Sequence, residues 1–144
     1  MIMKKLYLLI YLCLSISCMH LNKQKNMEIK KISIAFQDFF ENDIVSVELN
    51  KCLIVKDILL NSSKDIGNTG VVLYVDNKNR VFIGQDDIIT TCNVKLKVEN
   101  TISIILNGNK KTFNINLSKG SYFGFDKKGD DVFIIQSKLP FEYD

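Results

Sequence analysis

Apolar and polar residues alternate with a period of two along much of this chain, and this pattern limits the fold more strongly than any other feature. The alternation runs through residues 31–36, 45–50, 93–99 and 112–117. Because successive side chains of a strand point to opposite faces, each run predicts a strand with one buried and one solvated face. Such strands are typical of antiparallel sheets.

Three further runs are apolar on both faces, and they predict strands at the centre of the sheets. They are Val71–Val75, Ile102–Leu106 and Val132–Ile135. The chain after Asn100 predicts a meander of three hairpins.

Turn sequences separate these runs. Asn107-Gly108 is the strongest hairpin signal, because both residues tolerate positive φ. Asp76–Asn79 and Lys127–Asp130 predict two more tight turns, and Asn61–Gly70 predicts a longer polar loop.

A chain of 144 residues is long enough for one ordinary domain. The pattern predicts about seven to nine strands in about 110 residues. The expected fold class is therefore all-β: a single antiparallel β-sandwich, or alternatively a small barrel, in residues 29–144.

The N-terminus has the pattern of an export signal. Lys4 and Lys5 precede an apolar run from Leu6 to Leu14, and small residues then lead to Cys18. The run is shorter than the roughly 20 apolar residues of a transmembrane helix. Residues 1–17 are therefore predicted to be a lipoprotein signal peptide.

Leu14-Ser15-Ile16-Ser17-Cys18 resembles a bacterial lipobox, in which the cysteine is lipidated and becomes the first residue after cleavage. The resemblance implies that residues 18–28 form a lipidated Cys18 and a flexible tether that holds the domain at a membrane. An ordinary cleaved signal and an uncleaved membrane anchor are the alternatives. Met19 follows Cys18, and by resemblance to lipoprotein sorting in Gram-negative bacteria this favours the outer membrane, with the domain facing the periplasm rather than the cell surface.

The charge balance argues against nucleic acid as a partner. Without Lys4 and Lys5, 17 basic residues face 16 acidic residues, and the two signs are interleaved along the chain. A nucleic-acid-binding protein is expected to carry a strongly basic face.

Histidine usage excludes several kinds of catalysis. The single histidine is His20, which lies in the predicted tether. A Ser-His-Asp or Cys-His arrangement and an imidazole zinc site therefore cannot form within the domain. We expect no enzyme activity and no cofactor; a hydrolase that uses two carboxylates is the minor alternative.

Two cysteines remain in the predicted domain, Cys52 and Cys92. An exported compartment allows them to form a disulfide, and two separate buried thiols are the alternative. No C-x-x-C pattern indicates a redox role.

Acidic residues near the predicted turns raise the question of calcium, which prefers oxygen ligands. Asp126, Asp130 and Asp131 are the best candidates. Their spacing matches no known calcium loop, and turn chemistry explains these aspartates equally well, so no metal is assigned.

Aromatic residues offer a candidate ligand contact. Tyr122 and Tyr74 could stack against a sugar ring, although aromatic residues in strands are more often part of the core.

Two stretches resemble known sequences. Phe39–Asn50 is similar to a strand motif in exported β-sandwich modules of Bacteroidetes-type bacteria. Gly120–Phe125 and Phe141–Asp144 resemble the end of small exported lipoproteins from the same bacteria. The resemblance implies an exported β-sandwich and carries over no ligand residue.

These features together predict a non-enzymatic binding module of the cell envelope. The expected partners are the membrane, through the lipid anchor, and a protein or a glycan. An inhibitor or structural envelope protein that acts on a protein partner is the alternative.

Overall fold

The computed structural model describes residues 32–84, 86–88 and 94–143, with the backbone alone for 86–88. Three predictions lie outside these ranges: the signal peptide, the lipidated Cys18 with its tether, and the participation of Cys92 in a disulfide. Within the described ranges, no helix is long and apolar enough to cross a membrane.

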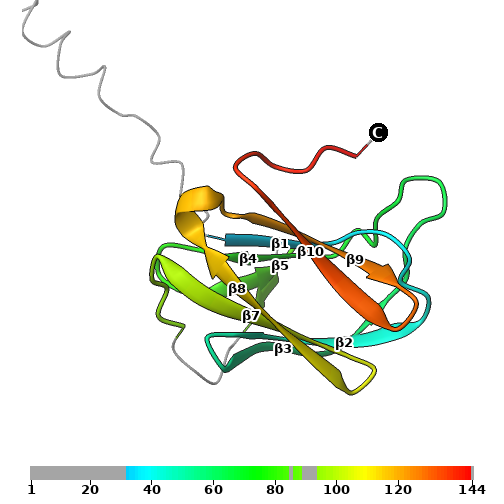
Figure 1. The fold of residues 1–144 in the computed structure, drawn as a ribbon, viewed down its shortest axis with the longest axis horizontal. Helices are drawn as coiled ribbons and strands as arrows, with labels where there is room; N and C mark the ends of the chain where they lie inside the picture. Colours follow the sequence, from blue (N-terminus) through cyan, green and yellow to red (C-terminus); the bar gives the residue numbers. More distant parts are fainter. Residues whose placement is uncertain (1–31, 85, 89–93, 144) are drawn as a thin grey trace, which may run out of the picture.

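Ten strands and one short 3₁₀ helix make up the described fold, which is nearly all-β (Figure 1). The elements are β1 (Ile32–Phe36), β2 (Asp43–Leu49), β3 (Cys52–Leu60), β4 (Val72–Val75), β5 (Val81–Ile83), β6 (Asp86–Ile88), β7 (Glu99–Leu106), β8 (Asn109–Asn116), η1 (Leu117–Lys119), β9 (Tyr122–Lys128) and β10 (Asp131–Ser137). The number of strands slightly exceeds the predicted seven to nine. Two of them, β5 and β6, have only three residues each.

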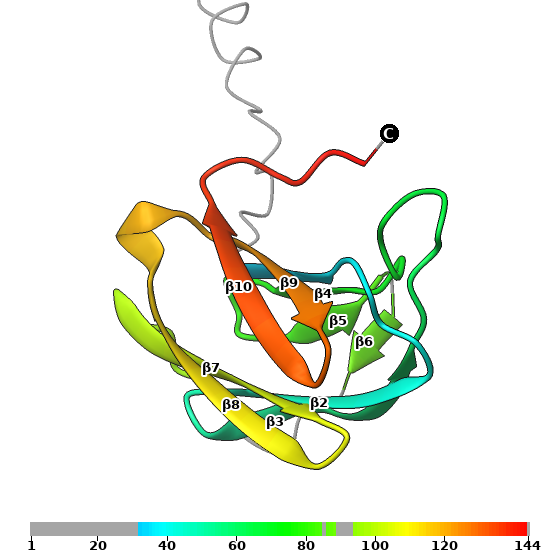
Figure 2. The same ribbon diagram turned by 45° about the vertical axis from the view of Figure 1, so that its right-hand side comes forward.

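The strands form two separate sheets that face each other as a sandwich. The first has the order β10-β9-β1-β4-β5-β6 and the second the order β3-β2-β7-β8. Figure 2 shows the two layers, with β6 at the far edge of the first sheet. Of the two predicted architectures, the structure thus forms the sandwich.

The core lies between the sheets and is filled from their inward faces. Phe36, Phe123 and Phe125 come from the first sheet, and Ile102 and Ile104 come from the second. The aromatic rings pack closely: the centroids of Phe36 and Phe125 are 6.1 Å apart. Burial of this apolar surface is the main driving force for packing the two sheets together.

One strand pairing corrects the prediction of a purely antiparallel sandwich. β1 pairs with β4 in the antiparallel sense but with β9 in the parallel sense, from Ser33 opposite Tyr122 to Phe36 opposite Phe125. Parallel neighbours need a long connection, and here the connection is most of the chain. A local sequence pattern cannot reveal such a distant pairing.

Strand β1 also lacks the predicted solvated face. Ser33 is 8% exposed and Ala35 is 5% exposed, so all five residues of β1 are buried. The strand lies inside its sheet, and its polar or small side chains are covered as well. The apolar and polar residues of β1 alternate in the sequence, but all of them are buried, so the predicted solvated face is wrong for this strand.

Three other strand predictions are wrong. Residues 94–98 form no strand and instead run as an irregular segment before β7, although Val94 is buried. Val132–Ile135 lies in β10, which is an edge strand, and Phe133 and Ile135 are about half exposed. The last strands form no meander, since β8 belongs to the second sheet and β9 to the first.

The turn predictions are confirmed. Asn107 and Gly108 adopt φ values of 48° and 86° and join β7 to β8, as a two-residue hairpin requires. The predicted turns at Asp76–Asn79 and Lys127–Asp130 join β4 to β5 and β9 to β10. Asn61–Gly70 is the predicted loop between β3 and β4.

A buried ion pair joins the two sheets. The ammonium group of Lys127, on β9, donates to both carboxylate oxygens of Asp43, on β2, at 2.8 and 2.9 Å. The side chains are only 14% and 3% exposed. Asp43 also accepts bonds from the Glu41 amide and from the Asn107 side chain. One carboxylate thus fixes the end of β9, the start of β2 and the β7–β8 turn.

Replacement of Lys127 by Met is expected to destabilise the fold by about 3 kcal/mol, because it leaves the buried Asp43 carboxylate without its counter-charge. Urea unfolding measures the change. Lys56→Met is the matched control: Lys56 lies 4.0 Å from Asp57, both are well exposed, and such pairs contribute about 0–1 kcal/mol. An equal loss in both variants would contradict the structural role of the Lys127–Asp43 pair.

The same pair makes stability depend on pH. Burial raises the pKa of Asp43, but the hydrogen bonds from Lys127, Glu41 and Asn107 and the charge of Lys127 outweigh it. They hold the pKa below its usual 3.8. A carboxyl group whose pKa falls on folding contributes stability that is complete above the unfolded value and is lost as the pH drops below it.

We therefore expect the free energy of unfolding to fall as the pH is lowered below about 4, with a shallower fall in Asp43→Asn. Urea midpoints between neutral and strongly acidic pH measure this dependence. Parallel curves for the two proteins would show that Asp43 does not carry the acid sensitivity.

Candidate functional site

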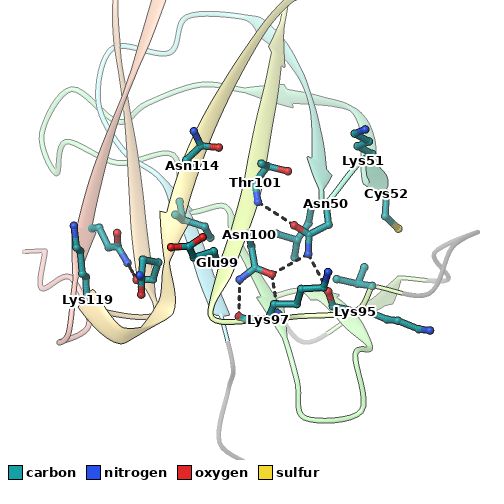
Figure 3. A pocket seen from close by; sticks show the side chains of 15 residues that line it. Asn50, Lys51, Cys52, Lys95, Lys97, Glu99, Asn100, Thr101, Asn114 and Lys119 are labelled. Atoms are coloured by element: carbon teal, nitrogen blue, oxygen red, sulfur yellow. Dashed lines mark hydrogen bonds between the residues drawn. The ribbon is translucent and has the colours of Figure 1, made fainter.

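An open hollow lies at one end of the sandwich, and we call it the end pocket (Figure 3). It has a volume of about 980 Å³ and is open to solvent. Its lining comes from the β2–β3 turn, the irregular segment 94–98, the start of β7, the end of β8 and η1. Three of these are strand ends or turns, which explains why most of the lining residues are polar.

Two asparagine amides form a rigid part of this lining. The side chain of Asn50 accepts a bond from the Thr101 amide at 2.9 Å and donates to the Lys95 carbonyl and to the Asn100 side chain. Asn100 in turn accepts a bond from the Lys97 amide and donates to the Lys97 carbonyl. Figure 3 shows this network joining three segments. It fixes the irregular segment in place of the ladder bonds that a strand would have made.

The conformation of the β2–β3 turn positions Asn50 for these hydrogen bonds. Asn50 and Lys51 have φ values of 52° and 66°, the left-handed values of a tight two-residue hairpin. Asparagine tolerates this conformation better than most residues. The turn leaves the Asn50 amide directed at β7 and leaves Lys51 exposed.

Helix η1 positions another lysine. The Asn116 side chain caps η1 by accepting a bond from the Ser118 amide at 2.9 Å. Gly120 follows with φ 144°, and a Cβ atom there would overlap the Ser137 carbonyl. This tight crossing from β8 to β9 places Lys119 at the edge of the end pocket.

Four lysines and one glutamate line the end pocket, namely Lys51, Lys95, Lys97, Lys119 and Glu99. All five side chains are exposed. Within the described part of the chain, the four ammonium groups make no hydrogen bond or ion pair. Lys119 and Lys51 stand on opposite sides of the pocket in Figure 3. The end pocket therefore has an uncompensated formal charge of +3.

Cys52 lies in the wall of the end pocket and is disulfide-bonded. Its predicted partner, Cys92, lies outside the described residues, so this pairing stays a prediction. A disulfide at Cys52 would fix the strand that follows the β2–β3 turn.

Tyr74 and Tyr122, the candidate ligand contacts, do not line the end pocket. The structure does bring them together on the outer face of the first sheet, because both are paired with Ser33, Tyr74 on β4 and Tyr122 on β9. Both are half-buried. Tyr74, Ser33 and Tyr122 form a single row across three neighbouring strands, although the two tyrosines are far apart in the sequence.

The calcium candidates are not gathered at one site. Asp131 receives bonds from Lys111 and from the Val132 amide, whereas Asp126 accepts a long bond from the Asp38 amide. Among the described residues, no group of three or more acidic, histidine or cysteine side chains could hold a metal ion. Asp126 instead lines a smaller hollow of about 380 Å³.

The lysines and amides of the end pocket are not among the candidate residues predicted from the sequence. The available signals were Asn50-Lys51 as a turn sequence and the two lysines of Lys95-Leu96-Lys97. The alternation predicts that Asn50, Lys95 and Lys97 are solvated positions of strands.

Comparison with known proteins gives one curated relative. A cell division protein, DivIB of Clostridium acetobutylicum, is 35% identical over 92 residues, which is 63% of this chain. The chain spans only about 36% of the length of that relative. No family model matches the chain, and no solved structure gives a significant match.

The amide network gives a test of how the end pocket is built. Asn50→Asp removes both donors of Asn50 and places a carboxylate beside the Lys95 carbonyl, so we expect a loss of about 1–3 kcal/mol. Hydrogen exchange should become faster at Lys97 and Thr101. Asn114→Asp, which changes an exposed amide in the same pocket, should leave both measurements unchanged; equal effects would argue against the network.

Proposed function

We propose that this protein is a non-enzymatic binding module of the cell envelope and that its ligand is a glycan held in the end pocket. The observation that carries the proposal is a large open pocket lined by hydrogen-bonded amides and by exposed lysines. Ligand sites are concave and contain a few well-placed polar groups. Amide and ammonium groups suit a ligand that is rich in hydroxyl groups.

The chemistry of the pocket favours binding over catalysis. Among the residues that line it, Glu99 is the sole carboxylate, whereas glycoside hydrolysis usually needs two. Cys52 is oxidised in a disulfide and cannot act as a nucleophile. The lining thus has groups that orient a ligand and lacks a pair that could cleave it.

The envelope placement rests on the N-terminal sequence. The apolar run, the lipobox-like segment and Cys18 support a lipid-anchored protein of the outer membrane that faces the periplasm. The tether before the domain would allow the end pocket to reach envelope polymers near the membrane surface.

A protein partner is the second candidate. The chain is similar to a cell division protein over 92 residues, and we infer that a structural role in the envelope would use a protein partner. The outer face of the first sheet, with Tyr74 and Tyr122 in one row, is the surface for that alternative.

A variant with a filled end pocket distinguishes glycan binding from binding of a protein partner. The full chain, purified in neutral detergent, is applied to an array of envelope glycans that includes peptidoglycan fragments. We expect one glycan class to be retained, and Asn114→Trp to weaken its retention at least about tenfold by occupying the end pocket. Asn109→Trp, at the other end of the same strand, is the matched control.

Equal retention by both variants would place the binding outside the end pocket. If no glycan is retained and cross-linking in the native envelope captures one protein partner instead, the glycan-binding function is wrong and the alternative gains support.

A further inference from the structure

Some lysines of the described residues are paired with carboxylates, whereas the four lysines that line the end pocket are not. Lys110, Lys111 and Lys127 each lie within 2.8 Å of a carboxylate oxygen, which neutralises their charge locally. The four lysines of the end pocket have no such partner within the described residues. Like charges gathered around one recess repel each other, so folding alone does not favour this arrangement.

The smaller hollow has the opposite formal charge. The smaller hollow is lined by four carboxylates and no basic residue, namely Asp38, Asp65, Asp126 and Glu142. Asp38 follows the end of β1, whereas the start of β1 is bonded to Ser121, two residues after Lys119. The two hollows therefore lie toward opposite ends of β1.

We propose that the end pocket binds an anionic glycan and that its lysines contact carboxylate or phosphate groups of the sugar chain. This inference rests on the proposed function and names the class of its ligand. The near-zero net charge of the predicted mature chain includes two hollows of opposite formal charge. Opposite charges of this kind steer a polyanion to the basic hollow and away from the acidic one.

The shape of the site favours a glycan over an anionic membrane surface. The lysines surround a recess and do not form a flat face, and the recess also presents the exposed Asn114 amide. A recess of about 980 Å³ can hold sugar units whose hydroxyl groups reach these amides. A bilayer would contact the rim alone.

The experiment is a calorimetric titration of the full chain in neutral detergent. The two ligands are hexagalacturonate and a neutral galactohexaose of the same length, and the measured quantity is the affinity for each. We expect hexagalacturonate to bind at least about tenfold more tightly at 0.1 M salt. The preference should shrink at 1 M salt, because the screening length falls from about 10 Å to about 3 Å.

Two charge-reversal variants localise the effect. Lys95→Glu with Lys97→Glu should weaken hexagalacturonate binding at least about tenfold and leave the neutral sugar nearly unchanged. Lys64→Glu with Lys128→Glu changes the total charge equally at exposed lysines that do not line the end pocket, and it should preserve binding. Melting curves of both variants confirm that they are folded.

Each outcome bears on a different claim. Equal affinity for the two sugars, or an equal loss in the two variants, overturns the anionic ligand while glycan binding stands. No binding of either sugar, together with an array on which nothing is retained, overturns the glycan function as well. Salt-sensitive protection of Lys95 and Lys97 from acylation in vesicles containing about 30% phosphatidylglycerol, without sugar binding, would assign the basic end to the membrane instead.

Discussion

The pairing of β1 with two neighbours from distant parts of the chain is the constraint on which the rest of this structure depends. β1 lies between β4 and β9, and all five of its residues are buried. Without it, the first sheet would separate into the β9–β10 hairpin and the β4–β5–β6 group. Because both edges of β1 carry ladder bonds, one short strand fixes the N-terminal and C-terminal parts of the domain against each other.

Charged groups have two distinct uses in this fold. Lys127 and Asp43 form a buried pair that links the sheets, and Asp43 is satisfied by further donors from the backbone and Asn107. A buried charge is tolerable when it is paired and hydrogen-bonded in this way. The lysines of the end pocket have the reverse character, since they remain exposed and unpaired within the described chain. The Lys127–Asp43 pair links the sheets, whereas the positive charges of the end pocket are available to attract the anionic ligand that we propose.

Hydrogen-bonded amides beside exposed ammonium groups are a suitable combination for recognition. Asn50 and Asn100 are held by several bonds each, so the irregular segment that carries Lys95 and Lys97 has a fixed backbone. A fixed backbone lowers the entropy that binding must overcome, while long lysine side chains adapt to the ligand.

Local chemistry explains which predictions succeeded. Asn107-Gly108 forms its hairpin because the two residues themselves tolerate positive φ. The segment 94–98 has the same alternation as a strand, yet the side-chain amides of Asn50 and Asn100 bind its backbone. Val132–Ile135 is as apolar as a central strand, but its position in the sheet order leaves Phe133 half exposed. In both cases the sequence predicts a preference for the strand conformation. The number of strands that pair with each segment depends on the tertiary structure.

By itself, the sequence determined the all-β class, the positions of the turns and the polar loop, because these follow from side-chain periodicity and from the φ values that single residues tolerate. Tertiary structure alone decided the parallel contact of β1 with β9, the row that joins Tyr74 to Tyr122 across Ser33, and the basic end pocket. The residues of the end pocket are spread from Leu49 to Gln136. Residues so far apart meet only after the two sheets have packed, since the packing of their inner faces sets which strand ends lie together.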